Sequence, residues 1–164
     1  MLKKLFAIIC AVSLLGACAS HEEGADIYGN ANGGWNPDVN ISDLKATGLT
    51  EKFNDDTTPV VYFKLNSSSL STEAKTALKA QAQWLKDNPR ALIVIEGNCD
   101  ERGTTEYNFA LGERRANAAR RYLMTNGISA DRIRTISYGK EKPTAVGSNE
   151  EAWAQNRNAT TVAY

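Results

Sequence analysis

Two oppositely charged side chains are the strongest candidates for ligand binding in this sequence. Asp100 lies in a polar loop that follows a short apolar run, and Arg115 lies in the segment that comes next. An arginine fork pairs with a carboxylate, and an aspartate pairs with an ammonium group. A cleft between the two would therefore suit a zwitterionic ligand. The same spacing also allows the two side chains to form an internal salt bridge that holds the loop to the helix.

A strand, a loop and a helix are expected to position this pair. The apolar run at residues 92–95 is rich in β-branched side chains and predicts a buried strand, which ends at Gly97, where the backbone can turn sharply. Thr104 is a suitable N-cap for the following helix, and Glu106 places a carboxylate in its first turn. Helical spacing then relates Leu111, Arg115, Ala119 and Tyr122.

The rest of the pattern alternates strands with helices. Segments rich in β-formers predict further strands at residues 59–65, 133–138 and 159–164. Ser71 is the expected N-cap of another helix, in which apolar residues recur at Ala74, Leu78, Ala82 and Leu85. Ser148 opens a capping-box pattern for a short helix through about residue 156. This order predicts an α/β (α+β) two-layer sandwich, with helices packed on one face of a mixed four-stranded sheet.

The start of the chain has the features of a secretory signal peptide. Lys3 and Lys4 precede an apolar run of about 11 residues, which is too short to span a bilayer that needs about 20. The run ends in Leu-Gly-Ala-Cys, which resembles a lipobox and implies cleavage before Cys18 and acylation of that cysteine. An ordinary signal peptide with a chance cysteine is the alternative. Ala19 stands where an aspartate marks inner-membrane retention in such lipoproteins, so the outer membrane is expected.

A polar segment separates this start from the predicted domain. Residues 18–58 show little apolar periodicity and are predicted to be a flexible tether. The apolar exceptions either pack on the domain, contact a partner or are scattered in a coil; they are Trp35, Ile41, Leu44 and Leu49. The expected organisation is a signal peptide at residues 1–17, a lipidated cysteine and flexible tether at 18–58, and one folded domain at 59–164.

Charge and reactive side chains exclude several classes of function. Nineteen basic and nineteen acidic residues give a formal net charge of zero, which argues against a nucleic-acid partner. The single histidine, His21, lies in the tether, and Cys99 is left without a partner thiol if Cys10 is removed and Cys18 acylated. We find neither a nucleophile–base pair nor a metal-ligand set, so we predict no catalytic residue, no metal site and no cofactor.

Several motifs in one order resemble a known family. They are Val-Tyr-Phe at residues 61–63, Gly-Asn-Cys-Asp-Glu-Arg-Gly-Thr at 97–104, Glu-Tyr-Asn at 106–108, Leu-Gly-Glu-Arg-Arg-Ala-Asn-Ala at 111–118, Ser-Tyr-Gly-Lys-Glu-Lys-Pro at 137–143 and Asn-Arg at 156–157. Together they resemble the OmpA-like peptidoglycan-binding domain and, within that family, its lipid-anchored members, the peptidoglycan-associated lipoproteins. The likeness extends from about residue 60 to residue 164.

The resemblance implies a ligand and a set of contacts. The ligand is the meso-diaminopimelate stem peptide of peptidoglycan, whose side chain ends in an amine and a carboxylate. Asp100 matches the family aspartate that takes the ammonium, and Arg115 matches the arginine that takes the carboxylate. The predicted ligand-binding residues are Asp100, Arg115, Leu65, Asn66, Arg102 and Leu111.

Two departures from the family pattern lie within the span of this likeness. Asn66 stands where an aspartate is usual, and Asn158 replaces the second arginine of the C-terminal motif. An asparagine can donate and accept hydrogen bonds but brings no charge. One contact to the ligand's ammonium is therefore expected to be weaker here.

The resemblance also implies a cellular role. The chain would be an outer-membrane lipoprotein, anchored through acylated Cys18, with its domain facing the periplasm. It would join outer membrane to cell wall as part of a Tol-Pal system, with TolB and other Tol proteins as partners, in envelope integrity and outer-membrane constriction during cell division.

Two other functions remain to be weighed against this one. The first is a cell-wall-processing enzyme, such as an amidase or peptidase. We do not expect an enzyme, because only Asp100 and Glu101 resemble paired carboxylates and they are adjacent in one loop. The second is a partner-binding module whose peptidoglycan site is degenerate.

Overall fold

The computed structural model describes residues 34–36, 38–41 and 48–164. Within this part the helices are α1 (Gly48–Asp56), α2 (Thr72–Asp87), α3 (Thr105–Thr125), the 3-10 helix η2 (Ala130–Arg132) and α4 (Glu150–Asn156). The strands are β1 (Val60–Tyr62), β2 (Ile93–Asn98), β3 (Ile133–Gly139) and β4 (Asn158–Ala163). The strand order across the sheet is β1-β4-β2-β3. Strand β3 is parallel to β2, whereas β4 is antiparallel to both of its neighbours.

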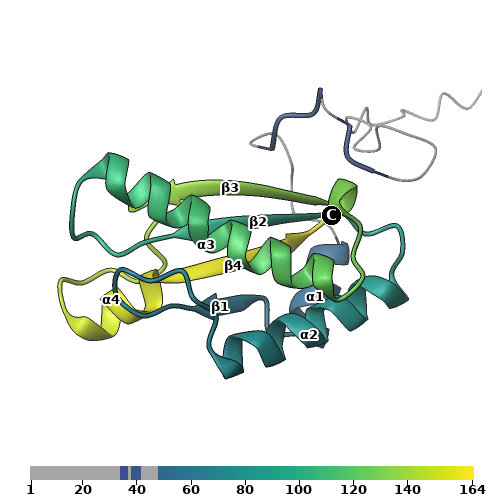
Figure 1. Ribbon diagram of the computed structural model, residues 1–164, viewed down its shortest axis with the longest axis horizontal. Coiled ribbons are helices and arrows are strands. Elements are labelled where there is room, and N and C mark those ends of the chain that lie inside the picture. The colour runs from purple at the N-terminus through teal and green to yellow at the C-terminus, as the bar shows by residue number, and fades with distance from the viewer. Residues whose placement is uncertain (1–33, 37, 42–47) are drawn as a thin grey trace, which may run out of the picture.

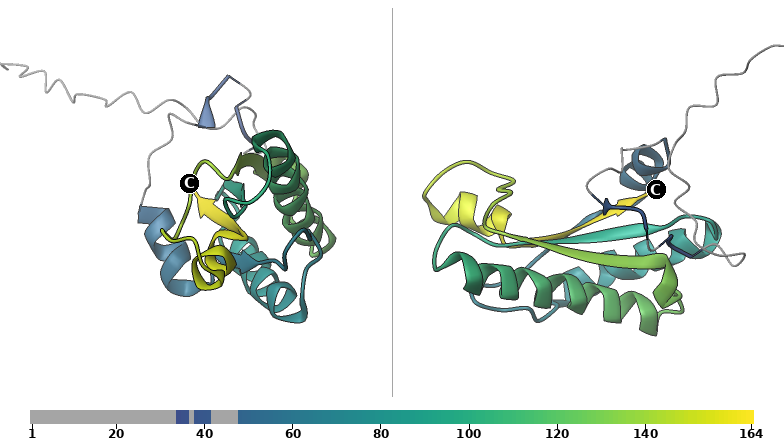
Figure 2. Two further views of the ribbon diagram at one scale, coloured as in Figure 1. Left: turned by 90° about the vertical axis from the view of Figure 1, so that its left-hand side faces the viewer. Right: turned by 90° about the horizontal axis from the view of Figure 1, so that it is seen from above.

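The two long helices, α2 and α3, cover one face of the sheet (Figures 1 and 2). The core between the layers contains Leu78 and Leu85 of α2, Ile95 of β2 and Leu123 of α3, all fully buried. This arrangement confirms the predicted two-layer sandwich on a mixed four-stranded sheet. The end of β2, the start of α3 and α4 lie at one end of the molecule, whereas α1 and the C-terminus lie at the other (Figure 1).

Local sequence signals place the starts of the two long helices correctly. Ser71 and Thr104 each accept a hydrogen bond from the backbone N–H three residues later, which confirms both predicted N-caps. Asn149, not Ser148, has this role at the start of α4. Strand β1 ends three residues before its predicted boundary, because its partner β4 begins opposite the last residue of β1.

Helix α3 lies very close to β2, and two glycines permit this contact. A Cβ atom at Gly97 would lie 1.9 Å from the backbone oxygen of Gly112, and one at Gly112 would lie 2.3 Å from Oγ of Ser137. The predicted strand end at Gly97 is wrong, since β2 continues to Asn98. Glycine inside a helix costs about 0.5–1 kcal/mol relative to alanine. The close approach of α3 to β2 therefore explains why α3 contains Gly112, which would otherwise only weaken the helix.

Helix α1 lies in the segment that the sequence assigns to the tether. Its Phe53 is fully buried and packs edge-to-face on Trp84 of α2, with ring centroids 4.9 Å apart. The indole N–H of Trp84 donates to Asp56 at 3.0 Å. The folded part therefore includes Gly48 to Asp56 and does not start at residue 59. One aromatic residue in a polar run gives no helical periodicity, so the sequence pattern does not reveal α1.

Residues 34–36 and 38–41 pack on the opposite face of the sheet from α2 and α3. Trp35 is 8 % exposed and belongs to a second buried cluster with Leu92 and Val94. The ring of Trp35 lies 6.0 Å from that of Tyr164, at an interplanar angle of 66°. The position of Trp35 covers apolar side chains that would otherwise face solvent.

The side chain of Arg134 in β3 binds the backbone of the segment that contains Trp35. The guanidinium donates to the carbonyl oxygens of Asn36 and Val39, at 2.6 and 2.7 Å. Of the apolar residues whose role the sequence leaves open, those that pack on the domain are Trp35, Ile41 and Leu49. Leu44, Cys18 and the predicted signal peptide lie outside the described residues.

The burial of Phe53 gives a test of where the domain begins. A fragment of residues 59–164 should be less stable than one of residues 48–164 by about 3–5 kcal/mol, because removing a buried phenylalanine leaves a cavity. Urea unfolding of both fragments measures the difference. Phe53→Ala in the longer fragment should reproduce most of the loss, and Lys52→Ala, on the exposed side of α1, should not. Equal stability of the two fragments would restore the boundary at residue 59.

Candidate functional site

The predicted ligand-binding residues gather at one small cavity at the end of β2. Its walls come from the loop after β1, the loop after β2, the first half of α3 and the residue between α4 and β4. The residues that line it are Leu65, Asn66, Cys99, Asp100, Arg102, Asn108, Leu111, Arg115 and Arg157. All six residues singled out from the sequence are among them. Cys99, Asn108 and Arg157 are additional.

Asp100 is a buried carboxylate held by two guanidinium groups. It accepts from Arg102 Nε at 3.2 Å and Nη2 at 2.6 Å, from the backbone N–H of Arg102 at 3.2 Å, and from Arg157 Nη1 at 3.4 Å. Burial alone would raise the pKa of Asp100, but these hydrogen bonds and charges outweigh burial and lower the pKa below its ordinary value of 3.8. Asp100 is therefore an anion at neutral pH, and its ion pairs weaken only in acid.

Arg115 connects two backbone segments from inside the cavity. It is 1 % exposed and donates to the carbonyl oxygens of Ser67 at 2.9 Å, Asn98 at 2.7 Å and Lys64 at 3.2 Å, and to Cys99 Sγ at 3.4 Å. Burial lowers the pKa of Arg115. These bonds fasten the loop before α2 to the end of β2. Arg115 is consequently a structural residue as well as a candidate ligand contact.

The internal salt bridge between Asp100 and Arg115 is not formed among the described residues. The ion-pair partners of Asp100 there are Arg102 and Arg157, and no carboxylate in that part lies within 4.0 Å of Arg115. The guanidinium has five N–H donors and makes four hydrogen bonds. A buried cation without a carboxylate partner is costly. The inner wall of the cavity therefore favours an anionic group.

Arg157 is the main site residue that sequence reasoning missed. Its side chain is 9 % exposed and donates to Phe63 O at 3.2 Å and to Glu150 Oε1 at 2.8 Å, besides its contact with Asp100. The signal that could have found it is the Asn-Arg motif at residues 156–157, which the family pattern includes. Spacing alone gives no indication, because 57 residues separate Arg157 from Asp100.

Asn108 and Cys99 support the loop that carries Asp100. The Asn108 side chain donates to the carbonyl oxygen of Arg102 at 2.8 Å, and Cys99 Sγ contacts the carbonyl oxygen of Asn108 at 3.4 Å. Burial is the largest effect on Cys99 and raises the pKa of its thiol. The thiol is thus held protonated and packs as a small side chain.

The two departures from the family pattern occupy different places. Asn66 lines the cavity in a left-handed backbone conformation, with φ of 53°, and its side-chain oxygen lies 3.5 Å from the hydroxyl of Tyr107. Asn158 does not line the cavity. It is fully buried and accepts from the amide of Asn98 at 2.9 Å. Only Asn66 can therefore alter a direct ligand contact.

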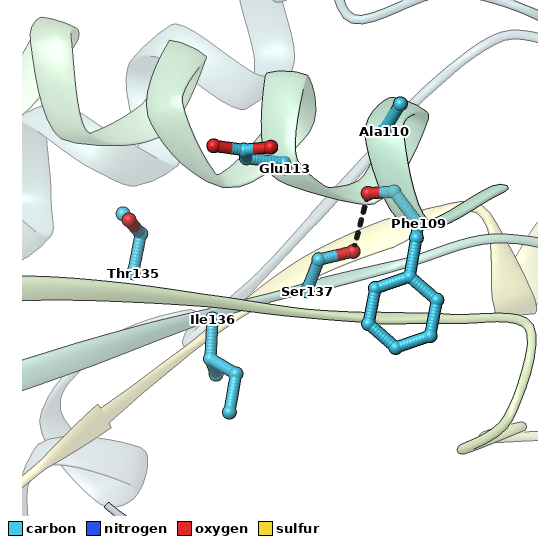
Figure 3. A pocket seen from close by; sticks show the side chains of 6 residues that line it. All are labelled: Phe109, Ala110, Glu113, Thr135, Ile136 and Ser137. Carbon is cyan, nitrogen blue, oxygen red and sulfur yellow. Dashed lines mark hydrogen bonds between the residues drawn. The ribbon is translucent and has the colours of Figure 1, made fainter. Parts of the chain in front are cut away.

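A larger hollow lies between α3 and β3. Figure 3 shows the residues that line it, and a dashed line marks the hydrogen bond from Ser137 Oγ to Phe109 O at 2.7 Å. Glu113 is the one charged residue among those lining this hollow. It offers no cation for a ligand carboxylate, so the cavity at Asp100 is the better candidate for a zwitterion.

Neither a metal site nor a membrane span is found in the described part of the chain. No group of three or more histidine, cysteine, aspartate or glutamate side chains there could hold a metal ion. No helix among those residues is long and apolar enough to cross a membrane.

The structural role of Arg115 can be measured without any ligand. Arg115→Ala should destabilise the chain by about 3 kcal/mol, because three carbonyl oxygens lose their donor and a buried space is left. Arg114→Ala, at the exposed neighbouring position, should change the stability by less than about 0.5 kcal/mol. Urea unfolding compares the two variants. Similar values for both would show that Arg115 does not hold these segments together.

Comparisons with known proteins place the chain in a family. The model of the OmpA family matches residues 62–157. The peptidoglycan-associated lipoprotein of Mesorhizobium japonicum is 52% identical over 101 residues, which are 62% of this chain and 60% of that protein. The chain therefore spans about three fifths of that relative's length. The protein of the same name from Pseudomonas aeruginosa is 42% identical over 166 residues, covering 94% of this chain and 92% of that protein.

Solved structures of related proteins have the same fold as this chain. The crystal structure of the peptidoglycan-associated lipoprotein from Burkholderia pseudomallei has a TM-score of 0.64 and 46% identity, and covers 65% of this chain and 91% of that one. The C-terminal domain of Helicobacter pylori MotB has a TM-score of 0.60 at 18% identity, over 64% of this chain and 83% of that one, which is a likeness of fold alone. The lipoprotein relatives are not named as enzymes, in agreement with the expectation for this chain. Since the family model matches more than half of its length, the chain belongs to the OmpA family, in which these relatives are peptidoglycan-associated lipoproteins.

Proposed function

We propose that the chain is an outer-membrane lipoprotein that binds peptidoglycan non-covalently and tethers the outer membrane to the cell wall. The observation that carries the proposal is a cavity lined by both a buried carboxylate, Asp100, and a buried guanidinium, Arg115. The cavity lies inside the segment that the OmpA family model matches. The names of the lipoprotein relatives supply the association with peptidoglycan.

The proposed ligand is the diaminopimelate side chain of the stem peptide. Asp100 takes its ammonium, and the N–H that Arg115 has left takes its carboxylate. Leu65 and Leu111 pack against the methylene groups between these charges. Asn66 supplies a neutral hydrogen bond at the position where the family pattern has an acid.

Affinity for a single stem peptide should be modest. Hydrogen bonds to charged groups contribute about 1.5–3 kcal/mol each, and desolvation and ordering offset part of this. A lipid anchor at Cys18 would keep the domain near a wall that presents many copies of the ligand, so rebinding would be fast. A weak reversible site is sufficient for a tether.

The length of chain before the folded part limits the reach of the proposed tether. With residues 34–36 and 38–41 packed on the sheet, the chain between Cys18 and the first described residue comprises residues 18–33. Fully extended, such a segment spans at most about 55 Å. This reach is shorter than that of a tether extending to residue 58.

The proposed partners beyond the wall are TolB and other Tol proteins, in a Tol-Pal system that acts in envelope integrity and division. Support for this part is the likeness to peptidoglycan-associated lipoproteins. The alternative of a degenerate site is less favoured, because the departures at Asn66 and Asn158 leave Asp100 and Arg115 in place.

Cosedimentation with purified sacculi tests the proposal. The chain should pellet with diaminopimelate-type sacculi without releasing soluble fragments, and less well with lysine-type sacculi, whose stem peptide lacks the second carboxylate. Asp100→Asn should weaken binding about tenfold or more, since an ammonium loses its charged partner. Asp55→Asn, at an exposed acid of α1, is the matched control. If both variants pellet equally, Asp100 does not contact the ligand. Release of soluble fragments would instead indicate an enzyme.

A further inference from the structure

The carboxylate proposed to receive the ligand's ammonium is already fully occupied. Oδ1 of Asp100 accepts from the backbone N–H and Nε of Arg102, and Oδ2 accepts from Arg102 Nη2 and Arg157 Nη1. A carboxylate has about four acceptor positions. An ammonium can therefore reach Asp100 only if one of these donors leaves.

Arg157 is poorly placed to leave. Its side chain is 9 % exposed, and its other nitrogens bond the carbonyl oxygen of Phe63 and the carboxylate of Glu150. Its contact with Asp100, at 3.4 Å, is also the longest of the four. Moving Arg157 would break two further interactions.

Arg102 has the opposite properties. Its side chain is 33 % exposed, and its guanidinium carbon lies 4.1 Å from the centre of the Trp153 ring. Nη1 is 3.8 Å from Oε2 of Glu150, so a second carboxylate stands beside the first. A small rotation would transfer the guanidinium from Asp100 to Glu150 while it stays on the indole face, where a cation is favoured.

We infer that Arg102 occupies the ammonium position of the empty site, and that a ligand's ammonium displaces its guanidinium onto Glu150. This inference rests on the proposed function. A ligand without a cationic group cannot replace Arg102, because Asp100 would lose its closest partner in a buried place. Arg102 is thus a specificity-determining residue, which restricts the site to ligands that carry an ammonium.

Removing Arg102 should strengthen binding. In the present chain the ammonium must displace the Arg102 guanidinium from Asp100. In Arg102→Ala the carboxylate keeps only two of its donors, Arg157 Nη1 and the backbone N–H of residue 102. For a partly exposed pair, we expect an increase in affinity of about two- to fivefold. Glu150→Gln should act in the opposite sense, because Arg102 then loses the second carboxylate that lies within 4.0 Å of it. In the double variant, the effect of Glu150→Gln should largely disappear.

Calorimetric titration of the full chain in detergent with a diaminopimelate tripeptide tests this inference. The same peptide with its side-chain amine acetylated is the control ligand, and Arg102→Ala should not increase its affinity. If the unchanged protein binds the tripeptide and Arg102→Ala binds it equally or more weakly, the inference is wrong while the proposed function stands. If no variant binds either peptide, both are wrong.

Discussion

The contact between α3 and β2 at Gly97 and Gly112 is the constraint on which the candidate site depends. A Cβ atom at either glycine would overlap atoms of the other element, so the helix can lie on the strand only because both side chains are absent. Arg115 follows Gly112 by three residues and therefore points down at the end of β2. There its guanidinium reaches the carbonyl oxygen of Asn98, and the loop before α2 closes over it. The cavity is a consequence of this approach.

The charges around the cavity follow from the same geometry. Asp100 is brought beside Arg157, the residue that precedes β4, because β4 and β2 are neighbours in the sheet. Arg102, in the same loop as Asp100, provides the closest partner. Buried charges are tolerated in proteins when they are paired or hydrogen-bonded, and this cluster meets that condition with backbone carbonyls as well as ion pairs. The empty site is therefore stable, and one N–H of Arg115 is left for a ligand's carboxylate.

The sequence predicts much of the framework and of the site. The strand at residues 92–95, the caps at Ser71 and Thr104 and the two long helices follow from periodicity and local hydrogen bonding, which depend on neighbouring residues only. The family motifs brought together six residues that line one cavity. Contacts between remote segments leave no such signal. Phe53 in α1, the helix contact at Gly97 and the role of Arg157 each depend on a partner far away in the chain, and none has a periodic pattern.

A residue-by-residue titration tests the central claim most directly, namely that the cavity at the end of β2 is the binding site. In an NMR titration of the chain with a diaminopimelate tripeptide, the account predicts that the largest amide shifts occur at residues 65–67 and 99–102 and at the start of α3. The hollow between α3 and β3 should show little change at Thr135 and Ile136. Shifts centred on that hollow, or no shifts at Asp100, would contradict the account.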